Sequence, residues 1–109
     1  MTQTPRFGSA LLINSVGLHA RPSVKLTQTA KRFASVVEFA LDAAGPWVDA
    51  KSPVKVMRVK AARGTTLYFR VTGADAAAAI EALVGLVERQ FDETDIPAGE
   101  DRGTDGTAL

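Results

Sequence analysis

Apolar residues near the C-terminal end repeat at the spacing of a helix that packs against a core. From the first of them, the others follow at +3, +4, +7 and +11. These residues are Ile80, Leu83, Val84, Val87 and Phe91. Asp75 precedes the run, at a position where an aspartate can cap a helix. A helix with one apolar stripe must bury that stripe against another layer, so the rest of the chain has to supply one.

Four short segments are predicted to be strands that this helix can cover. Residues 8–14, GSALLIN, form a short apolar run before the loop SVG, which is typical of a buried strand. Residues 35–42 and 47–50 contain β-forming residues and flank the turn sequence AAGP, which predicts a hairpin. Residues 65–73, TTLYFRVTG, are rich in β-branched and aromatic side chains, which favours a fourth strand.

Two further helices are expected between these strands. Apolar residues recur at helical spacing in residues 20–33, with lysine and arginine on the other faces. Ser52 is a favourable helix cap, and Pro53 is suited to the first helical position. We therefore predict a short helix through VKVMRVK, residues 54–60.

The resulting order, β-α-β-β-α-β-α, predicts an α+β domain in which three helices cover one face of a four-stranded antiparallel sheet. The length of 109 residues and the 46% hydrophobic content suit one compact domain. We assign this domain to residues 1–91, which carry 12 Lys+Arg and 6 Asp+Glu. Residues 92–109 carry 1 and 6 and few large apolar groups, so we expect a disordered acidic tail or a linker.

Composition also excludes several kinds of chemistry. The chain has no cysteine and a single histidine, which argues against disulfides, thiolate metal sites and a zinc cage, so no metal or cofactor is expected. No apolar run approaches the roughly 18 residues that span a bilayer, and the N-terminal residues lack the basic segment of a signal peptide. We therefore expect a cytoplasmic protein with no membrane insertion.

The single histidine lies in residues 17–23, GLHARPS, where a strand gives way to a helix. His19 is expected at or beside the helix cap, with Pro22 in the first turn and the backbone N–H groups of residues 20–23 pointing outward. Such an end attracts anions, and the planar donors of Arg21 suit phosphate. The pattern indicates a histidine that takes up a phosphoryl group. The alternative is a histidine that only caps the helix or lies on the surface.

These residues carry a resemblance to a known family. GLHARPS after a strand is similar to the active-site signature of the HPr family, the histidine phosphocarriers of the phosphoenolpyruvate-dependent phosphotransferase system. The similarity continues at AKS, residues 50–52, at Gly64-Thr65 and at Gly73-Ala74-Asp75, and covers about residues 8–91. It implies the family's open-faced β-sandwich, which agrees with the predicted order of elements.

The resemblance also implies a stoichiometric carrier, not an enzyme. His19 would accept a phosphoryl group on Nδ1 from enzyme I and pass it to an enzyme IIA domain, and Arg21 would stabilise the phosphoryl oxygens. The helix start around them would be formed by Gly17, Ala20, Pro22 and Ser23. Ser52 matches a serine that a dedicated kinase, an HPr kinase/phosphorylase, modifies in some bacteria, although a plain helix cap explains Ser-Pro equally well. We expect a monomer.

The second helix is predicted to supply the rest of a docking surface. Val54 and Met57 would form an apolar patch beside His19, ringed by cations that suit an acidic partner. The cations are Lys25, Lys51, Lys55 and Arg58. The alternative is that Val54 and Met57 belong partly to the core and the lysines only solvate the helix.

Three functions are compatible with these features. Sugar uptake through the phosphotransferase system comes first, and a nitrogen-type regulatory branch of the same relay is the alternative. A nucleic-acid-binding module is a remote third, because the body is basic. That role calls for aromatic side chains on a sheet face, and only Tyr68 and Phe69 lie together on a predicted strand, where alternation turns at least one inward. We therefore expect no nucleic-acid partner.

Overall fold

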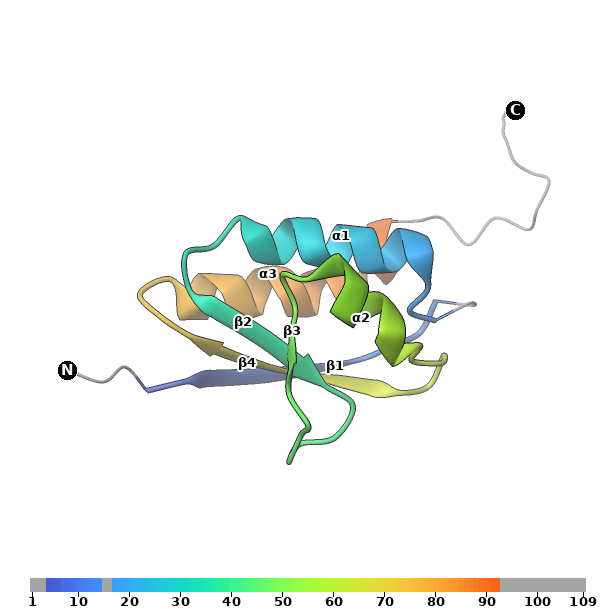
Figure 1. The fold of residues 1–109 in the computed structure, drawn as a ribbon, viewed down its shortest axis with the longest axis horizontal. Helices are drawn as coiled ribbons and strands as arrows, with labels where there is room; N and C mark the ends of the chain where they lie inside the picture. The colour runs from blue at the N-terminus through green and yellow to red at the C-terminus, as the bar shows by residue number, and fades with distance from the viewer. Residues whose placement is uncertain (1–3, 15–16, 93–109) are drawn as a thin grey trace.

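The computed structural model describes residues 4–14 and 17–92. Within these ranges the elements follow in the predicted order, β-α-β-β-α-β-α (Figure 1). They are β1 (Arg6–Leu11), α1 (Ala20–Lys31), β2 (Val36–Ala40), β3 (Val48–Asp49), α2 (Pro53–Val59), β4 (Thr66–Thr72) and α3 (Ala76–Glu88), followed by a 3-10 turn, η1 (Gln90–Asp92). The predicted loop residues 15–16 and tail residues 93–109 lie outside the described residues.

The strands form one antiparallel sheet in the order β1-β4-β2-β3. All three helices lie on the same face of this sheet, and the other face is open (Figure 1). The predicted α+β class, with a four-stranded antiparallel sheet covered on one face by three helices, is therefore confirmed.

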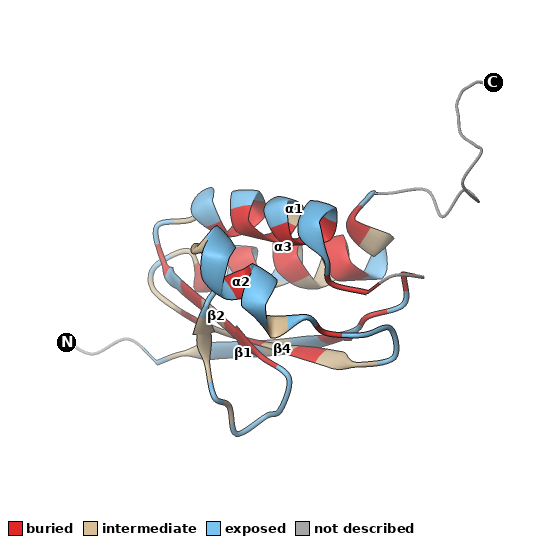
Figure 2. Ribbon diagram, turned by 45° about the vertical axis from the view of Figure 1, so that its right-hand side comes forward, coloured by how far each residue is buried: buried red, intermediate tan, exposed pale blue. Residues whose placement is uncertain are grey.

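The alternation of side chains along β4 builds the core. Leu67, Phe69 and Val71 are fully buried under the helices, and the residues between them are half-buried on the open face (Figure 2). This period of two is the ordinary consequence of a pleated strand. Burying each of these large side chains contributes roughly 1.5–3 kcal/mol to folding.

The predicted apolar stripe of α3 faces this core, but the helix is shorter than expected. Leu83, Val87 and Phe91 are fully buried, whereas Ile80 and Val84 are half-buried and pack against the core. The helix ends at Glu88, and Phe91 lies in η1 with a φ of 59°. The turn still buries the phenyl ring of Phe91. The last apolar residue of the predicted stripe therefore reaches the core although the helix does not continue to it.

Other boundaries also differ from the predictions. The first strand covers Arg6–Leu11 and not residues 8–14, because its pairing with β4 ends at Leu11 opposite Thr66. Helix α1 ends at Lys31 and not at residue 33, where Phe33 N–H donates to the Ala30 carbonyl 3.2 Å away and tightens the last turn.

The second and third strands are shortened as well, and the second helix begins and ends one residue earlier than predicted. Of the predicted residues 35–42 and 47–50, only Val36–Ala40 and Val48–Asp49 are strand, with five residue pairs between β2 and β4 and two between β2 and β3. Helix α2 begins at Pro53 and ends before Lys60, which takes a left-handed conformation with a φ of 54°.

Asp75 has a different role from the predicted helix cap. It occupies the cap position of α3, but its side chain makes no capping hydrogen bond. Its carboxylate instead accepts hydrogen bonds from Ser35 Oγ, from Ala34 N–H at 2.9 Å and from Ser35 N–H at 3.0 Å. The hydroxyl of Ser35, followed by the Ala34 amide, holds the pKa of Asp75 below its ordinary value. Asp75 thereby ties the loop between α1 and β2 to the start of α3.

The open face of the sheet carries more aromatic side chains than the sequence suggested. Phe69 points inward as expected, and Tyr68 lies on the open face. Phe7 and Trp47 join it there, with ring centroids 6.3 Å apart. The ring of Trp47 also contacts the Arg70 guanidinium at 4.6 Å, and Arg70 Nε is 2.9 Å from Glu38 Oε1. Phe7, Trp47, Arg70 and Glu38 thus form a chain of side-chain contacts on the open face.

Candidate phosphoryl-acceptor site

His19 caps the N-terminus of α1 with its backbone and leaves its imidazole uncommitted to the helix. Its φ and ψ of −122° and −160° are extended, and its side chain makes no capping hydrogen bond. Its carbonyl accepts the first helical hydrogen bond, from Ser23 N–H at 2.9 Å. The side chain is exposed. The predicted position at the helix cap is therefore confirmed, and the ring is accessible to a reacting group.

Fewer backbone N–H groups can bind an anion at this helix end than the sequence predicted. Of the four predicted backbone donors, that of Ser23 is used within the helix, and Pro22 has no N–H. Ser23 is also fully buried, with its hydroxyl directed away from the surface. Ala20 and Arg21 are the remaining positions of the first turn, where the helix dipole favours a negative charge by roughly 0.3–1 kcal/mol.

A short network of hydrogen bonds fixes the loop that precedes His19. Asn14 Nδ2 donates to the Gly17 carbonyl at 2.7 Å, and Gly17 N–H donates back to the Asn14 carbonyl at 3.1 Å. Leu18 N–H donates to the carbonyl of Ala61 at 2.8 Å. Gly17 has a φ of 71°, and a Cβ there would lie 2.5 Å from the Ala61 oxygen. The residues that follow α2 are thus held against the residues that precede α1.

This contact creates a surface hollow of about 440 Å³ beside the histidine. Its lining residues are Leu18, His19, Ala20, Met57, Lys60, Ala61 and Ala62. Met57 of α2 and Lys60, the left-handed residue that follows α2, line the hollow together with His19. The sequence prediction included Met57 but missed Lys60 and Asn14. No local pattern marks these two residues, because their positions depend on the pairing of Leu18 with Ala61.

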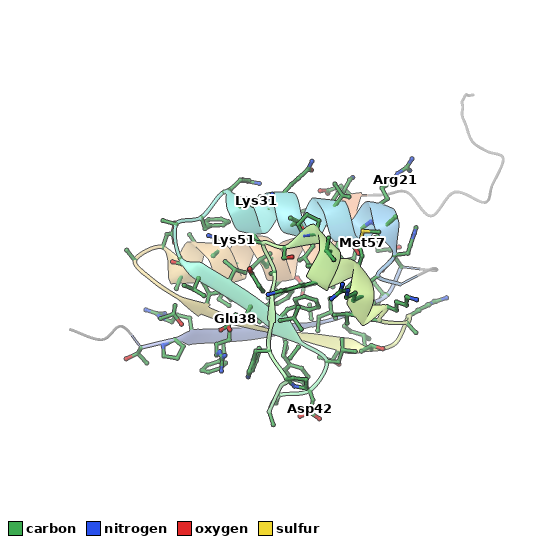
Figure 3. All side chains as sticks on the ribbon, viewed as in Figure 1. Arg21, Lys31, Glu38, Asp42, Lys51 and Met57 are labelled. Atoms are coloured by element: carbon green, nitrogen blue, oxygen red, sulfur yellow. The ribbon has the colours of Figure 1, made fainter. Side chains whose placement is uncertain are left out.

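The predicted docking residues are mostly on the surface. Val54 is 60% exposed and Met57 44% exposed, and it is Val56 that α2 buries in the core. Lys55 and Arg58 are exposed as well. Figure 3 shows Arg21 and Met57 toward the same end of the molecule, away from the end of α1 that carries Lys31.

Two predicted residues are engaged in local structure. Lys51 Nζ donates to the Phe33 carbonyl at 2.7 Å, so its ammonium group ties the segment before α2 to the end of α1. Ser52 is the cap of α2, and its Oγ accepts from Lys55 N–H at 3.3 Å. The predicted cap is confirmed. The ammonium group of Lys51, in contrast, is used in a hydrogen bond within the fold.

The stretches that build this region are cationic throughout. Residues 17–34 and 50–74 contain lysine and arginine but no aspartate or glutamate. Within residues 4–14 and 17–92, no three His, Cys, Asp or Glu side chains gather as metal ligands would. None of the helices in that same part of the chain is long and apolar enough to cross a membrane.

Comparison with known proteins agrees with the class that the fold and the histidine define, a phosphoryl carrier. The family model described as "PTS HPr component phosphorylation site" matches residues 9–89. The phosphocarrier protein HPr of Cupriavidus necator is 43% identical over 82 residues, which are 75% of this chain and 90% of that protein. The phosphocarrier protein HPr of Neisseria meningitidis serogroup A is 42% identical over the same shares.

Solved structures show the same relationship. HPr-C-His from Thermoanaerobacter tengcongensis superposes with a TM-score of 0.73 at 32% identity, covering 82% of this chain and 98% of that one. The phosphocarrier protein HPr from Bacillus anthracis gives a TM-score of 0.69 at 29% identity, covering 75% and 95%. The chain belongs to the HPr family. It is a non-catalytic phosphocarrier of the phosphotransferase system, and the family's partners are enzyme I and enzyme IIA.

Proposed function

We propose that His19 is the residue that carries the phosphoryl group and that Arg21 stabilises it. The observation that supports this most is the exposed imidazole of His19 at the start of α1, which makes no capping hydrogen bond and lies beside a hollow lined by Met57 and Lys60. A lone pair on Nδ1 attacks phosphorus, the N–P bond forms, and the bond from phosphorus to enzyme I breaks. The same steps in reverse, with an enzyme IIA domain as acceptor, discharge the carrier. Neutral imidazole is required, because a protonated nitrogen has no lone pair.

The surroundings of His19 favour transfer over tight retention. The helix dipole and the guanidinium of Arg21 stabilise the phosphoryl oxygens, while the exposed position lets a partner reach the phosphorus. Stabilisation that is moderate leaves the N–P bond reactive toward the next acceptor. The exposed Val54 and Met57, with Lys55 and Arg58 around them, form the docking surface for a partner with an acidic face.

The test is phosphorylation by phosphoenolpyruvate and a cognate enzyme I. The parent chain gains one acid-labile phosphoryl group, and His19→Ala gains none. Gln28→Ala, at an exposed position further along α1, serves as the control and labels like the parent. Labelling of the His19→Ala variant would contradict the assignment. Arg21→Lys keeps the charge but loses the planar pair of donors, so it is expected to label more slowly.

The particular branch that we propose is sugar uptake, with the carrier acting as a monomer in the cytoplasm. The relatives from Cupriavidus necator and Neisseria meningitidis are both named phosphocarrier protein HPr, which supports this branch over the nitrogen-type alternative. Discharge of the phosphorylated chain to a panel of enzyme IIA domains separates the two. Faster discharge to a sugar-specific domain supports the proposal, and faster discharge to a nitrogen-type domain contradicts it.

We further propose Ser52 as a regulatory position. Its half-buried hydroxyl caps α2, whose exposed side chains form the docking surface, and a phosphate there adds about −1.5 to −2 charges to a cationic region. Incubation with ATP and an HPr kinase/phosphorylase should modify the parent and not Ser52→Ala. Equal modification of both would remove Ser52 from this role.

A further inference from the structure

The surface formed by the first half of α1, by α2 and by the residues directly after α2 carries six cations. We call it the cationic face and define it by Arg21, Lys25, Lys55, Arg58, Lys60 and Arg63. All of these side chains are exposed except that of Lys25, which is half-buried. Lys60 lines the hollow beside His19, and the backbone nitrogen of Arg63 is 3.0 Å from the place that a Cβ of Gly17 would occupy. Lys60 thus brings a cation beside His19, and Arg21 follows His19 by two residues in the sequence.

The acidic residues lie outside the stretches 17–34 and 50–74 that supply these cations, and one of them, Asp49, lines a hollow together with Lys55 and Arg58. Those of residues 4–91 lie on β2, on β3, in the loop between them, and on or just before α3: Glu38, Asp42, Asp49, Asp75, Glu81 and Glu88. Residues 93–109 carry five acidic side chains and one arginine, a net charge of −4. The acidic ones are Glu93, Asp95, Glu100, Asp101 and Asp105. Residues 93–109 thus carry a net charge opposite in sign to that of the cationic face.

The described residues place the start of this segment beside the cationic face. The turn η1 packs against α1 and α3, with Phe91 buried as its anchor. Asp92, its last residue, has a pKa below the ordinary value, first because Arg89 donates a hydrogen bond to it and also because Lys25 lies near. Asp92, the last described residue, therefore lies near a member of the cationic face.

The segment is long enough to reach the proposed acceptor. His19 and Lys25 are six residues apart on α1, which corresponds to about 9 Å along a helix axis. Seventeen residues can extend over at most roughly 55–60 Å. A tethered segment also acts at an effective concentration in about the millimolar range, so weak pairing at the surface is sufficient for occupancy.

We propose that residues 93–109 bind the cationic face and compete with the acidic surfaces of the partners that dock there. The inference rests on the proposed function of His19 and adds a regulator of the same site, built into the chain. Its effect falls on association with partners, because exposed charges act mainly through the rate of encounter. Salt weakens this competition, because the ion pairs between residues 93–109 and the cationic face would be exposed to solvent.

The test compares the parent with a neutralised variant carrying Glu93→Gln, Asp95→Asn, Glu100→Gln, Asp101→Asn and Asp105→Asn. The control has the same residues 93–109 in shuffled order, which keeps the net charge. We expect enzyme I to phosphorylate the neutralised variant several-fold faster at about 0.01 M salt and equally fast at about 1 M, where screening shortens from about 30 Å to about 3 Å. The shuffled control should follow the parent at both salt concentrations.

A second measurement does not depend on phosphoryl transfer. Amide NMR spectra of the parent and the neutralised variant at low salt should differ at Ala20, Lys60 and Arg63 and agree on the open face of the sheet. If these shifts are present while His19→Ala still labels, the docking inference stands and the proposed acceptor is wrong. Identical spectra, a rate gain that persists at high salt, or shifts that grow with protein concentration, as for a segment from a second copy, would each overturn the inference.

Discussion

At the scale of single residues, Gly17 is the position on which the geometry of the site depends most. Its backbone has a φ of 71°, and its missing side chain leaves room for the carbonyl of Ala61. Two separate requirements therefore meet at this residue: a left-handed conformation and a close backbone approach. Gly64 shares only the first, since its φ is 92° but a Cβ there would meet nothing within 4 Å.

This pair of glycines gives a matched prediction. Gly17→Ala should lose about 1–3 kcal/mol of stability from strain, and more from the contact with Ala61. Since the contact displaces the loop ahead of His19, the rate of phosphorylation by enzyme I should fall as well. Gly64→Ala should lose a similar amount from strain alone and keep the parent's rate. Denaturant unfolding and the labelling rate, measured on both variants, check this, and equal rates for the two would contradict it.

At the scale of elements, Asp75 connects two pieces of structure through one carboxylate. It accepts hydrogen bonds from the loop between α1 and β2 while it occupies the cap position before α3. Gly73 lies against Ser35 in the same cluster, with a φ of 152° and no room for a side chain. The link joins the end of the helix that begins with His19 to the helix that covers β1 and β4.

The lowered pKa of Asp75 makes this link dependent on pH. The charged form is favoured in the folded state, so its contribution to stability is complete above the ordinary aspartate pKa of about 3.9 and is lost as the pH falls through the folded value. Asp75→Asn should therefore lower the melting temperature at pH 7 by several degrees, and the difference from the parent should shrink in acid.

Melting temperatures of both proteins between pH 7 and the acid range measure this effect. Ser35→Ala is the accompanying control, because it removes the largest cause of the lowered pKa and keeps the carboxylate. Its loss should be smaller than that of Asp75→Asn at pH 7. A difference between Asp75→Asn and the parent that stays constant at every pH would contradict the role of the charge.

The second element-scale prediction concerns Ser52 and the charge at the start of α2. Aspartate and asparagine both replace serine well as helix caps, so Ser52→Asp and Ser52→Asn should keep melting temperatures close to the parent's. Only Ser52→Asp adds a negative charge to the docking surface, and it should markedly slow phosphorylation by enzyme I. Ser52→Asn isolates the cap from the charge. Equal rates for the two variants would place Ser52 outside the docking surface.

At the scale of the whole molecule, the sequence predicted what depends on local periodicity. The β-branched and aromatic content of β4, the apolar stripe of α3 and the Ser-Pro start of α2 predicted these elements, and GLHARPS predicted His19 at a helix cap. The features that could not be predicted depend on pairing between distant segments. They include the contact of Leu18 with Ala61, the bond from Lys51 to the end of α1, and the turn of Asp75 toward Ser35.

The hollow shared by His19 and Met57 has a kinetic consequence for the relay. With His19 as the proposed carrier of the phosphoryl group, the donor and the acceptor both approach the same imidazole on a chain of 11.5 kDa. We therefore expect the two partners to exclude each other, so that each turnover requires one to leave before the other arrives. The rate of phosphoryl transfer through the relay then depends on how fast each complex dissociates. An excess of either partner keeps the carrier bound to that partner and slows transfer to the other.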